Sequence, residues 1–226
     1  MKDYKYILFD CDDTVLDFLA SEKKALVSLF NEYGIKPTKK AIDDYIEINE
    51  RYWKLYEAKV MSRDEILIKR FEEFFSKFNL SSDYKEVNEK YLTLLTKNVE
   101  VVDGISEVLD KLKDKYELYI ITNGVKWTQE ERLRQTEVRK YFKDFFISEA
   151  IGYQKPDKEF FKFVIEKIGD SDLSHYLVVG DSISSDILGG INAGIDTLWF
   201  NLKGIESSVK PTYEIKEVGE YLDILL

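Results

Sequence analysis

The chain has 226 residues, of which 44% are hydrophobic, with 15 Tyr, 14 Phe and 3 Trp. This is the composition of a folded globular protein, and the length allows one sizeable core plus an accessory domain. Lys and Arg number 33 against 43 Asp and Glu, so the formal net charge is -10. That balance argues against a broad phosphate-neutralising face, and we expect no nucleic-acid polymer as a partner.

Cysteine usage and hydropathy indicate the compartment. Cys11 is the only cysteine, which excludes an internal disulfide framework. The sequence has neither an N-terminal apolar signal segment nor an apolar run long enough to cross a membrane. We therefore expect a cytoplasmic protein without membrane association. As a separate expectation, we take the protein to be a monomer or a weak homodimer.

The first predicted strand is the apolar run 6–9, and it ends in an acidic cluster. Asp10, Asp12 and Asp13 follow within four residues, and Thr14 closes the cluster. A buried strand that ends in three carboxylates must either hold a cation or tolerate strong like-charge repulsion, and each choice perturbs pKa values. The pattern is typical of the mouth of an active site, with Asp13 interpreted as a polar turn residue.

Residues 16–97 contain helical patterns almost throughout. The first apolar stripe ends at Gly34, a natural helix stop, and Thr38 is placed to cap the next helix. The segment 62–65 has capping-box spacing, and a fourth helix is predicted over 83–96. The four helices predict a compact bundle, inserted after the first strand.

Beyond residue 103 the pattern changes to helices that alternate with short, wholly apolar strands. Such strands are typical of a buried parallel sheet with crossover helices. The predicted strands are 118–121, 145–147, 176–179 and 197–200, and the predicted helices are 105–113, 126–139, 158–168 and 185–193. The sequence thus predicts an α/β fold, a doubly wound Rossmann-like core of residues 1–15 and 98–226, with a helical-bundle cap over 16–97.

Polar residues that suit phosphate chemistry follow three of these five strands, and a fourth such segment lies after a turn between the third and fourth strands. In doubly wound sheets, ligands bind beyond the carboxyl ends of the strands. Each segment alone could be a turn or a solvated loop. All four together are much less expected by chance, because their order, their placement after predicted strands and their chemistry would all have to coincide. The segments are 10–14 after the first strand, Thr122-Asn123-Gly124 after the second, Lys155-Pro156 before the helix at 158, and 180–186 after the fourth.

These residues resemble the four motifs of the haloacid dehalogenase superfamily. The match comprises Asp10-x-Asp12-x-Thr14, Thr122, Lys155, and Asp181 with Asp186. It covers the whole chain and includes the inserted helical cap, of the C1 type in this family. Most members with an aspartate two residues after the nucleophile are Mg²⁺-dependent phosphatases or phosphotransferases, so the resemblance implies that chemistry here.

The resemblance gives the carboxylates separate duties. Asp10 would attack phosphorus in line and form an aspartyl-phosphate, which divides one difficult hydrolysis into two easier steps. Mg²⁺ would be held by Asp10, the Asp12 backbone carbonyl and Asp181, with Asp186 supporting the ion through water. Asp12 would protonate the leaving oxygen and then take a proton from the attacking water.

The remaining motif residues are expected to bind the phosphoryl group. Thr122 and the Asn123 amide would hold its oxygens, and Lys155 would balance charge on Asp10 and on the transferred group. Thr14, at the end of the first motif, is expected to orient Asp12.

A narrower resemblance concerns the substrate. The segments Phe9–Phe18, Ile121–Val125, Gly152–Pro156 and Gly180–Ser182 are similar to the noncanonical pyrimidine 5′-nucleotidase branch of the superfamily. This implies a small phosphorylated metabolite as partner, namely a pyrimidine nucleoside monophosphate such as UMP, dUMP or dTMP. The cap aromatics Tyr52, Trp53 and Tyr56 could stack on the base, although their helical spacing is also what a cap core requires.

Alternative functions remain open from the residues alone. A phosphatase for sugar phosphates or a phosphomutase would use the same motifs. A receiver-like phosphoacceptor switch also uses acidic residues, a Thr and a Lys-Pro, but there the acceptor follows the third strand and no cap is inserted. Asp12 argues against dehalogenation, and an acyl-transfer function of Ser182 lacks a histidine downstream, because the only histidine is His175.

Overall fold

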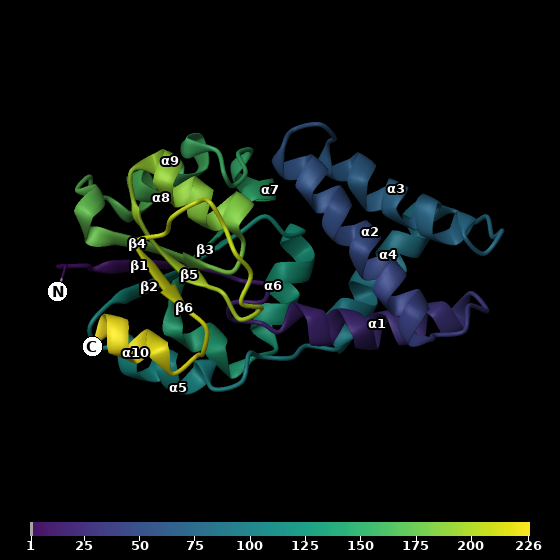
Figure 1. Cartoon of the computed structure of the whole chain (residues 1–226), viewed down its shortest axis with the longest axis horizontal. Coiled ribbons are helices and arrows are strands. Elements are labelled where there is room, and N and C mark those ends of the chain that lie inside the picture. Colours follow the sequence, from purple (N-terminus) through teal and green to yellow (C-terminus); the bar gives the residue numbers. More distant parts are fainter. Residues whose placement is uncertain (1) are drawn as a thin grey trace. The chain divides into compact units, whose positions relative to one another are not determined.

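The structure is a computed structural model that describes residues 2–226 (Figure 1). The chain folds as two compact units. The first comprises the described residues up to Phe18 together with Glu100–Leu226, and the second comprises Leu19–Val99. We call them the sheet unit and the helical unit, and each is described by itself.

The sheet unit is built on six parallel strands in the order β3-β2-β1-β4-β5-β6. This confirms the predicted α/β fold. Because the chain moves outward from β1 first to one side and later to the other, the strand order reverses at β1, where such sheets bind their ligands. The strands are β1 (Tyr6–Asp10), β2 (Glu117–Thr122), β3 (Phe142–Ile147), β4 (Tyr176–Gly180), β5 (Asp196–Phe200) and β6 (Tyr213–Ile215).

Helices cover both faces of this sheet, with α8 and α9 on one face and α5 and α10 on the other (Figure 1). The helices are α5 (Ile105–Leu112), α6 (Lys126–Arg134), α7 (Ser148–Ile151), α8 (Lys158–Ile168), α9 (Leu188–Ala193) and α10 (Glu220–Leu225). Successive side chains of β1 point to opposite faces of the sheet, as strand geometry requires. Leu8 packs in a buried cluster with Phe161 of α8, whereas the Phe9 ring lies 6.0 Å from the ring of Tyr221 in α10.

Two predicted helices of the sheet unit differ from the observed ones. The helix expected over 126–139 ends at Arg134, and residues 137–141 form a separate 3₁₀ turn. The helix expected over 185–193 begins with a π-helical turn at Ile183–Ile187, which α9 continues. Neither β6 nor α10 was predicted.

The helical unit contains four helices, as the periodicity predicts. They are α1 (Phe18–Glu32), α2 (Lys39–Glu57), α3 (Arg63–Ser76) and α4 (Tyr84–Lys97). The helix ends in this unit are formed by the residues that the sequence predicts for them. Gly34 follows α1 with φ +70°, Thr38 accepts a hydrogen bond from the Ala41 amide, and Ser62 forms a complete capping box with Glu65.

The core of the helical unit is aromatic but encloses a charged network. Arg70 is 1% exposed and donates to the side-chain oxygens of Asn49 (2.7 Å) and Asn88 (2.6 Å). The buried Glu22 accepts from Asn49 (2.9 Å) and from the Tyr91 hydroxyl (2.7 Å). A buried guanidinium and a buried carboxylate are thus joined through Asn49, which supplies the hydrogen bonds that buried charges need.

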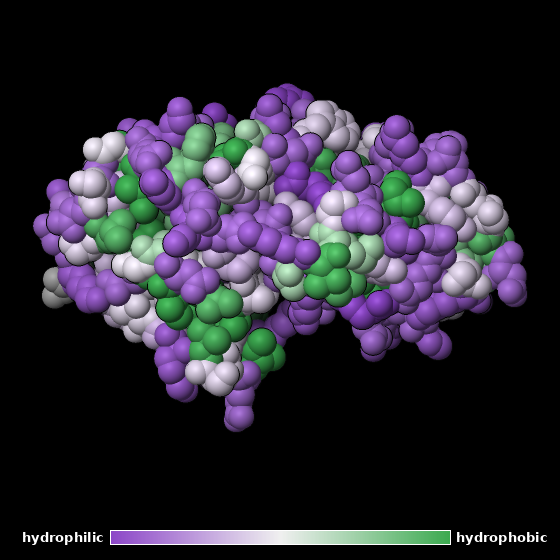
Figure 2. Space-filling model, turned by 90° about the horizontal axis from the view of Figure 1, so that it is seen from above, coloured by the Kyte–Doolittle hydropathy of each residue, from purple (hydrophilic) through white to green (hydrophobic). Residues whose placement is uncertain are grey.

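Hydrophilic side chains dominate the face drawn in Figure 2, and apolar ones form separate patches among them. Charged residues make up 34% of the chain, and such residues are expected mainly at the surface. Among the described residues, no helix combines the length and the apolar character needed to cross a membrane.

Candidate active site

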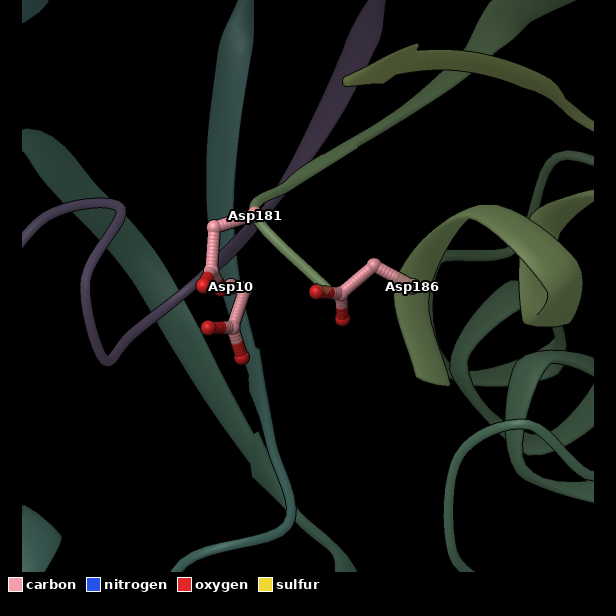
Figure 3. Close-up of side chains that lie close together, drawn as sticks. All are labelled: Asp10, Asp181 and Asp186. Atoms are coloured by element: carbon pink, nitrogen blue, oxygen red, sulfur yellow. The ribbon is translucent and has the colours of Figure 1, made fainter. Parts of the chain in front are cut away.

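Three aspartates converge at the carboxyl edge of the parallel sheet (Figure 3). Asp10 is the last residue of β1, Asp181 directly follows β4, and Asp186 lies in the π-helical turn. Each offers a carboxylate oxygen, and these oxygens all lie within 4.8 Å of one another. The parallel pairing of β1 with β4 explains why Asp10 and Asp181, which are far apart in the chain, meet here.

The space for Asp186 depends on Gly180. A Cβ atom at Gly180 would lie 2.2 Å from the Asp186 Oδ2 atom, so no larger residue fits there without displacing the carboxylate. The Ser182 backbone N–H donates to the same oxygen at 3.1 Å. Asp186 is fully buried. The last residue of β4 and the turn that follows it therefore fix this carboxylate from two sides.

Lys155 connects the acidic cluster to β2. Its Nζ atom donates to Asp10 Oδ1 (2.5 Å), to Asp186 Oδ1 (2.7 Å) and to the Ile121 carbonyl oxygen (3.0 Å). Burial by itself would lower the pKa of Lys155, but the carboxylates of Asp10 and Asp186 outweigh it and raise that pKa above its ordinary value. The lysine is therefore a fixed positive charge with all three of its protons donated to protein acceptors.

One lysine does not balance three neighbouring carboxylates. Burial, with the charges of Asp186 and Asp12, raises the pKa of Asp10 well above its ordinary value, even though Lys155 opposes the shift. Burial and the charges of Asp10 and Asp186 likewise raise the pKa of Asp181. Convergent carboxylate oxygens with an excess of negative charge are the donor set that a hard divalent cation prefers, so these residues fit a Mg²⁺ ion.

Thr122 and Asn123 lie beside Lys155, at the end of β2. The Thr122 hydroxyl oxygen accepts hydrogen bonds from the Gly124 amide (3.0 Å) and from Gln129 Nε2 (2.9 Å). The Asn123 side chain donates to the Lys155 carbonyl oxygen (2.8 Å) and accepts from the Lys155 amide (2.9 Å). The Asn123 side chain therefore holds the Lys155 backbone, and the sequence motif gave no sign of this reciprocal pair.

Asp12 is held by two residues that the sequence analysis missed. Gln129 Nε2 donates to Asp12 Oδ2 at 2.7 Å, and Arg132 Nη1 donates to Asp12 Oδ1 at 2.5 Å. Thr14, which was expected to orient Asp12, is fully buried, and its hydroxyl makes no hydrogen bond to any described residue. The only available signal was two polar residues three apart on a predicted helix, and nothing in the sequence placed that side of the helix against the first strand.

Several residues near the motifs have roles in the structure other than catalysis. Asp13 adopts φ +55°, which fits the predicted turn residue. Cys11 is buried, and burial, with the Asp12 charge, raises the pKa of its thiol, which makes it a poor nucleophile. His175 Nδ1 lies 2.7 Å from Asp170, and the hydroxyl of Ser182 lies 3.2 Å from that of Ser184, so these residues form no Ser-His pair.

The aromatic residues considered for base stacking have partners within the helical unit. Tyr52 and Tyr56 are buried; Tyr52 donates to Glu73 at 3.1 Å, and Tyr56 accepts from Arg63 at 2.7 Å. The Trp53 ring packs edge-on against Tyr56 with centroids 5.7 Å apart. These contacts favour the packing interpretation, and stacking on a substrate remains a hypothesis.

Comparisons with known proteins show which proteins this chain resembles in sequence and fold. A crystal structure of the HAD-hydrolase YfnB from Bacillus subtilis, bound to magnesium, matches with a TM-score of 0.94, 39% sequence identity and coverage of 99% of each chain. The pyrimidine 5′-nucleotidase PynA of Streptococcus pneumoniae is 37% identical over 225 residues, covering 98% of this chain and 95% of that protein. The pyrimidine 5′-nucleotidase YjjG of Escherichia coli is 31% identical over 224 residues, covering 98% of each.

The family assignment rests on the sequence as well. The model of the family described as haloacid dehalogenase-like hydrolase matches residues 7–200, which include all four motifs. The resemblance read from those motifs is thereby confirmed, and this chain belongs to the haloacid dehalogenase-like hydrolases.

Proposed function

We propose that the protein is a Mg²⁺-dependent phosphomonoesterase that forms an aspartyl-phosphate on Asp10, and that its substrates are pyrimidine nucleoside monophosphates. The observation that carries the proposal is the contact of Lys155 with both Asp10 and Asp186, which joins three sequence motifs around one carboxylate cluster. The magnesium-bound structure of YfnB and the names of PynA and YjjG support the metal and the substrate class respectively.

Asp10, Asp181 and Asp186 would hold the ion, together with the Asp12 backbone carbonyl. When bound, the cation would supply positive charge between a carboxylate and a phosphate dianion, which otherwise repel each other. The raised pKa values of Asp10 and Asp181 are consistent with this assignment, because burial and the neighbouring carboxylates disfavour their charged forms and a bound cation would favour them.

Asp10 and Asp12 would carry out the bond changes. An Asp10 carboxylate oxygen attacks phosphorus as the bond to the leaving oxygen breaks, and Asp12 gives its proton to that oxygen. Asp12, now ionised, takes a proton from a water molecule whose oxygen attacks phosphorus and displaces Asp10. Phosphate is released, and both aspartates return to their starting states.

Thr122 is suited to donate a hydrogen bond to the phosphoryl group. Its oxygen already accepts from Gly124 and Gln129, which uses both acceptor positions of the hydroxyl and leaves its proton for a ligand. The Asn123 side chain is engaged with the Lys155 backbone, so we assign the second contact to the Asn123 backbone N–H.

Lys155 would act mainly through its charge and through Asp10. All three ammonium protons have protein acceptors, so a direct bond to the phosphoryl group requires one of these hydrogen bonds to open. While they persist, the lysine fixes the Asp10 carboxylate and offsets the negative charge that develops on the transferred group.

The test is phosphate release from a panel of monophosphates with and without Mg²⁺. We expect UMP, dUMP and dTMP to be turned over faster than AMP, GMP or sugar phosphates. Asp10→Asn should lower kcat by roughly 10⁴-fold or more, as loss of a nucleophile does. Asp223→Asn is the matched control, because it makes the same chemical change at an exposed position of α10.

Different outcomes would contradict different parts of the proposal. Equal turnover of purine nucleotides or sugar phosphates would overturn the pyrimidine assignment while keeping the phosphatase. Full activity with EDTA, or an active Asp10→Asn variant, would overturn the mechanism. A phosphoryl group that stays on Asp10 for minutes without multiple turnover would indicate a phosphoacceptor switch.

A further inference from the structure

A pair of polar residues on α6 reaches the acidic end of the first strand. Gln129 and Arg132 are three residues apart, so they lie on one face of the helix. Each is only 1% exposed, which is unusual for these residue types and requires hydrogen-bond partners. The partners are Asp12 and Thr122, both in motifs of the candidate active site.

The contacts form one connected unit. Gln129 Nε2 donates both to Asp12 Oδ2 (2.7 Å) and to the Thr122 hydroxyl oxygen (2.9 Å). Arg132 Nη1 donates both to Asp12 Oδ1 (2.5 Å) and to Gln129 Oε1 (2.9 Å). Arg132 therefore fixes the orientation of the Gln129 amide, and Gln129 fixes the distance between Asp12 and Thr122.

Gly124 gives independent support for this arrangement. A Cβ atom at Gly124 would lie 2.5 Å from Gln129 Nε2 and 2.7 Å from Gln129 Cδ. The backbone after β2 thus passes so close to the glutamine side chain that only glycine leaves room for it. A side chain at residue 124 would therefore displace the Gln129 amide from this position.

We propose that Gln129 and Arg132 are positioning residues for the hydrolysis. They hold the Asp12 carboxyl group at a fixed place relative to the Thr122 hydroxyl, so that proton transfer and phosphoryl binding occur in one geometry. The inference rests on the proposed function, because it assumes that Asp12 transfers protons. It adds two residues, outside the four motifs, on which that transfer depends.

The consequence differs between the two chemical steps and between leaving groups. When the bond from phosphorus to an alkoxide oxygen breaks, that oxygen needs the proton of Asp12, whereas p-nitrophenolate is stable enough to leave without one. When water attacks the aspartyl-phosphate, Asp12 must accept a proton whatever the first leaving group was. A displaced Asp12 therefore slows both steps for nucleotides but only the second step for p-nitrophenyl phosphate.

The variants are Gln129→Met, Arg132→Lys and Gly124→Ala. The first removes the amide at nearly constant length, the second keeps the charge, and the third displaces Gln129 without removing a polar group. Arg134→Met is the matched control on the same helix, because Arg134 is exposed and pairs with Glu131. Circular dichroism and thermal melting establish that each variant is folded.

We expect the three variants to lower kcat/KM for nucleoside monophosphates by roughly 10- to 100-fold, within the range for general acid–base catalysis. With p-nitrophenyl phosphate, stopped-flow should show a burst of one equivalent of p-nitrophenol per enzyme at nearly the wild-type rate, followed by slow turnover. A crystal structure of Gly124→Ala should show Asp12 displaced from its position between Gln129 and Arg132. Arg134→Met should match the wild type in all three measurements.

Equal losses on both substrates without a burst would overturn the inference, because they indicate general damage to the site. Wild-type kinetics in all three folded variants would overturn it as well. In either case an active wild type and an inactive Asp12→Asn variant would leave the proposed function standing. A wild type with no phosphatase activity on any substrate would instead overturn both.

Discussion

The Asp186 carboxylate fills the space that a side chain at Gly180 would need. The Asp186 Oδ2 atom lies 2.2 Å from the position that a Cβ atom at Gly180 would take. The other oxygen of this carboxylate, Oδ1, accepts a hydrogen bond from Lys155 Nζ. A change at the end of β4 therefore reaches Asp186 and, through it, Lys155, without substituting either residue.

The first prediction is that Gly180→Ala displaces Asp186 and weakens the cation site. We expect the apparent affinity for Mg²⁺ to fall by at least about tenfold, in line with the loss of an outer-shell contact, and kcat to fall with it. The measurements are isothermal titration with Mg²⁺ and the dependence of phosphate release on Mg²⁺ concentration.

Gly219→Ala is the control for this experiment, because nothing lies within 4 Å of the position of its Cβ atom and its φ of -59° suits alanine. It should leave Mg²⁺ affinity and activity unchanged. Unchanged Mg²⁺ affinity in Gly180→Ala would show that Asp186 moves without consequence for the ion.

The second prediction concerns pH and Mg²⁺. Burial raises the pKa of Asp181 above its ordinary value of 3.8. At Asp181 the folded state therefore binds more protons than the unfolded chain, so in the absence of metal this group's contribution to stability is lost as the pH rises from about 4 through its folded-state pKa. A divalent cation competes with that proton, so the increase in Tm on adding Mg²⁺ should be larger at pH 8 than at pH 5.

Thermal melts at the two pH values, with and without Mg²⁺, measure this effect. Asp181→Asn should make the metal-free protein less sensitive to pH and should reduce the Mg²⁺-dependent increase in Tm. Asp223→Asn, at an exposed position of α10, should behave as the wild type. A Tm increase of the same size at both pH values would contradict the assignment of Asp181 to the cation site.

Local sequence signals predicted the helices and strands because their causes are local. The helix 158–168 was predicted with its observed bounds, and Thr38 and Ser62 cap their helices as expected. The helix expected to reach 139 ends at Arg134 instead, where the Gln135 and Thr136 amides bond back three residues, as in a tightening last turn. The three-residue strand β6 is too short for its alternation to be seen in the sequence.

The site was predictable where residues follow strands and not where a helix reaches across the fold. The motif carboxylates and Lys155 meet because the strands are parallel, which the apolar runs indicate. The contacts of Asp12 with Gln129 and Arg132 join residues 117 and 120 positions apart, and they depend on which side of α6 faces β1. That orientation follows from packing of the whole sheet unit, so no local pattern reports it.

The third prediction is that Arg70→Met destabilises the helical unit by about 3 to 5 kcal/mol, the usual cost of breaking a buried charge network on one side. The loss removes the hydrogen bonds that Arg70 donates to Asn49 and Asn88, and it takes a positive charge out of the buried network that includes Glu22. Urea denaturation followed by circular dichroism measures the free energy of unfolding. Lys69→Met, at a half-exposed position of the same helix, is the control and should change it by less than about 0.5 kcal/mol.

Adding Glu22→Gln to Arg70→Met separates charge from packing. If the cost arises from a buried carboxylate left without a counter-charge, the double variant should be more stable than Arg70→Met alone, because it removes that charge. Strictly additive losses would show that the two groups do not interact through Asn49.

The fourth prediction concerns Tyr221, whose ring packs between Phe9 (6.0 Å) and Phe200 (5.5 Å). The residue is fully buried, and its hydroxyl has no hydrogen-bond partner among the described residues. Burial, with the charges of Asp181 and Asp10, raises the pKa of this phenol, so it stays protonated. A buried donor without an acceptor costs stability, whereas the phenylalanine ring fills the same space.

Tyr221→Phe should therefore raise the free energy of unfolding by about 1 kcal/mol, measured in urea without Mg²⁺, and leave kcat unchanged. Tyr116→Phe is the matched control, because the Tyr116 hydroxyl donates to the Leu225 carbonyl oxygen at 2.5 Å and its removal should cost about 1 kcal/mol instead. The two variants make the same chemical change, one within α10 and one at a residue that bonds to α10, with opposite expected signs. A loss of stability in Tyr221→Phe would contradict the prediction that the buried hydroxyl destabilises the fold.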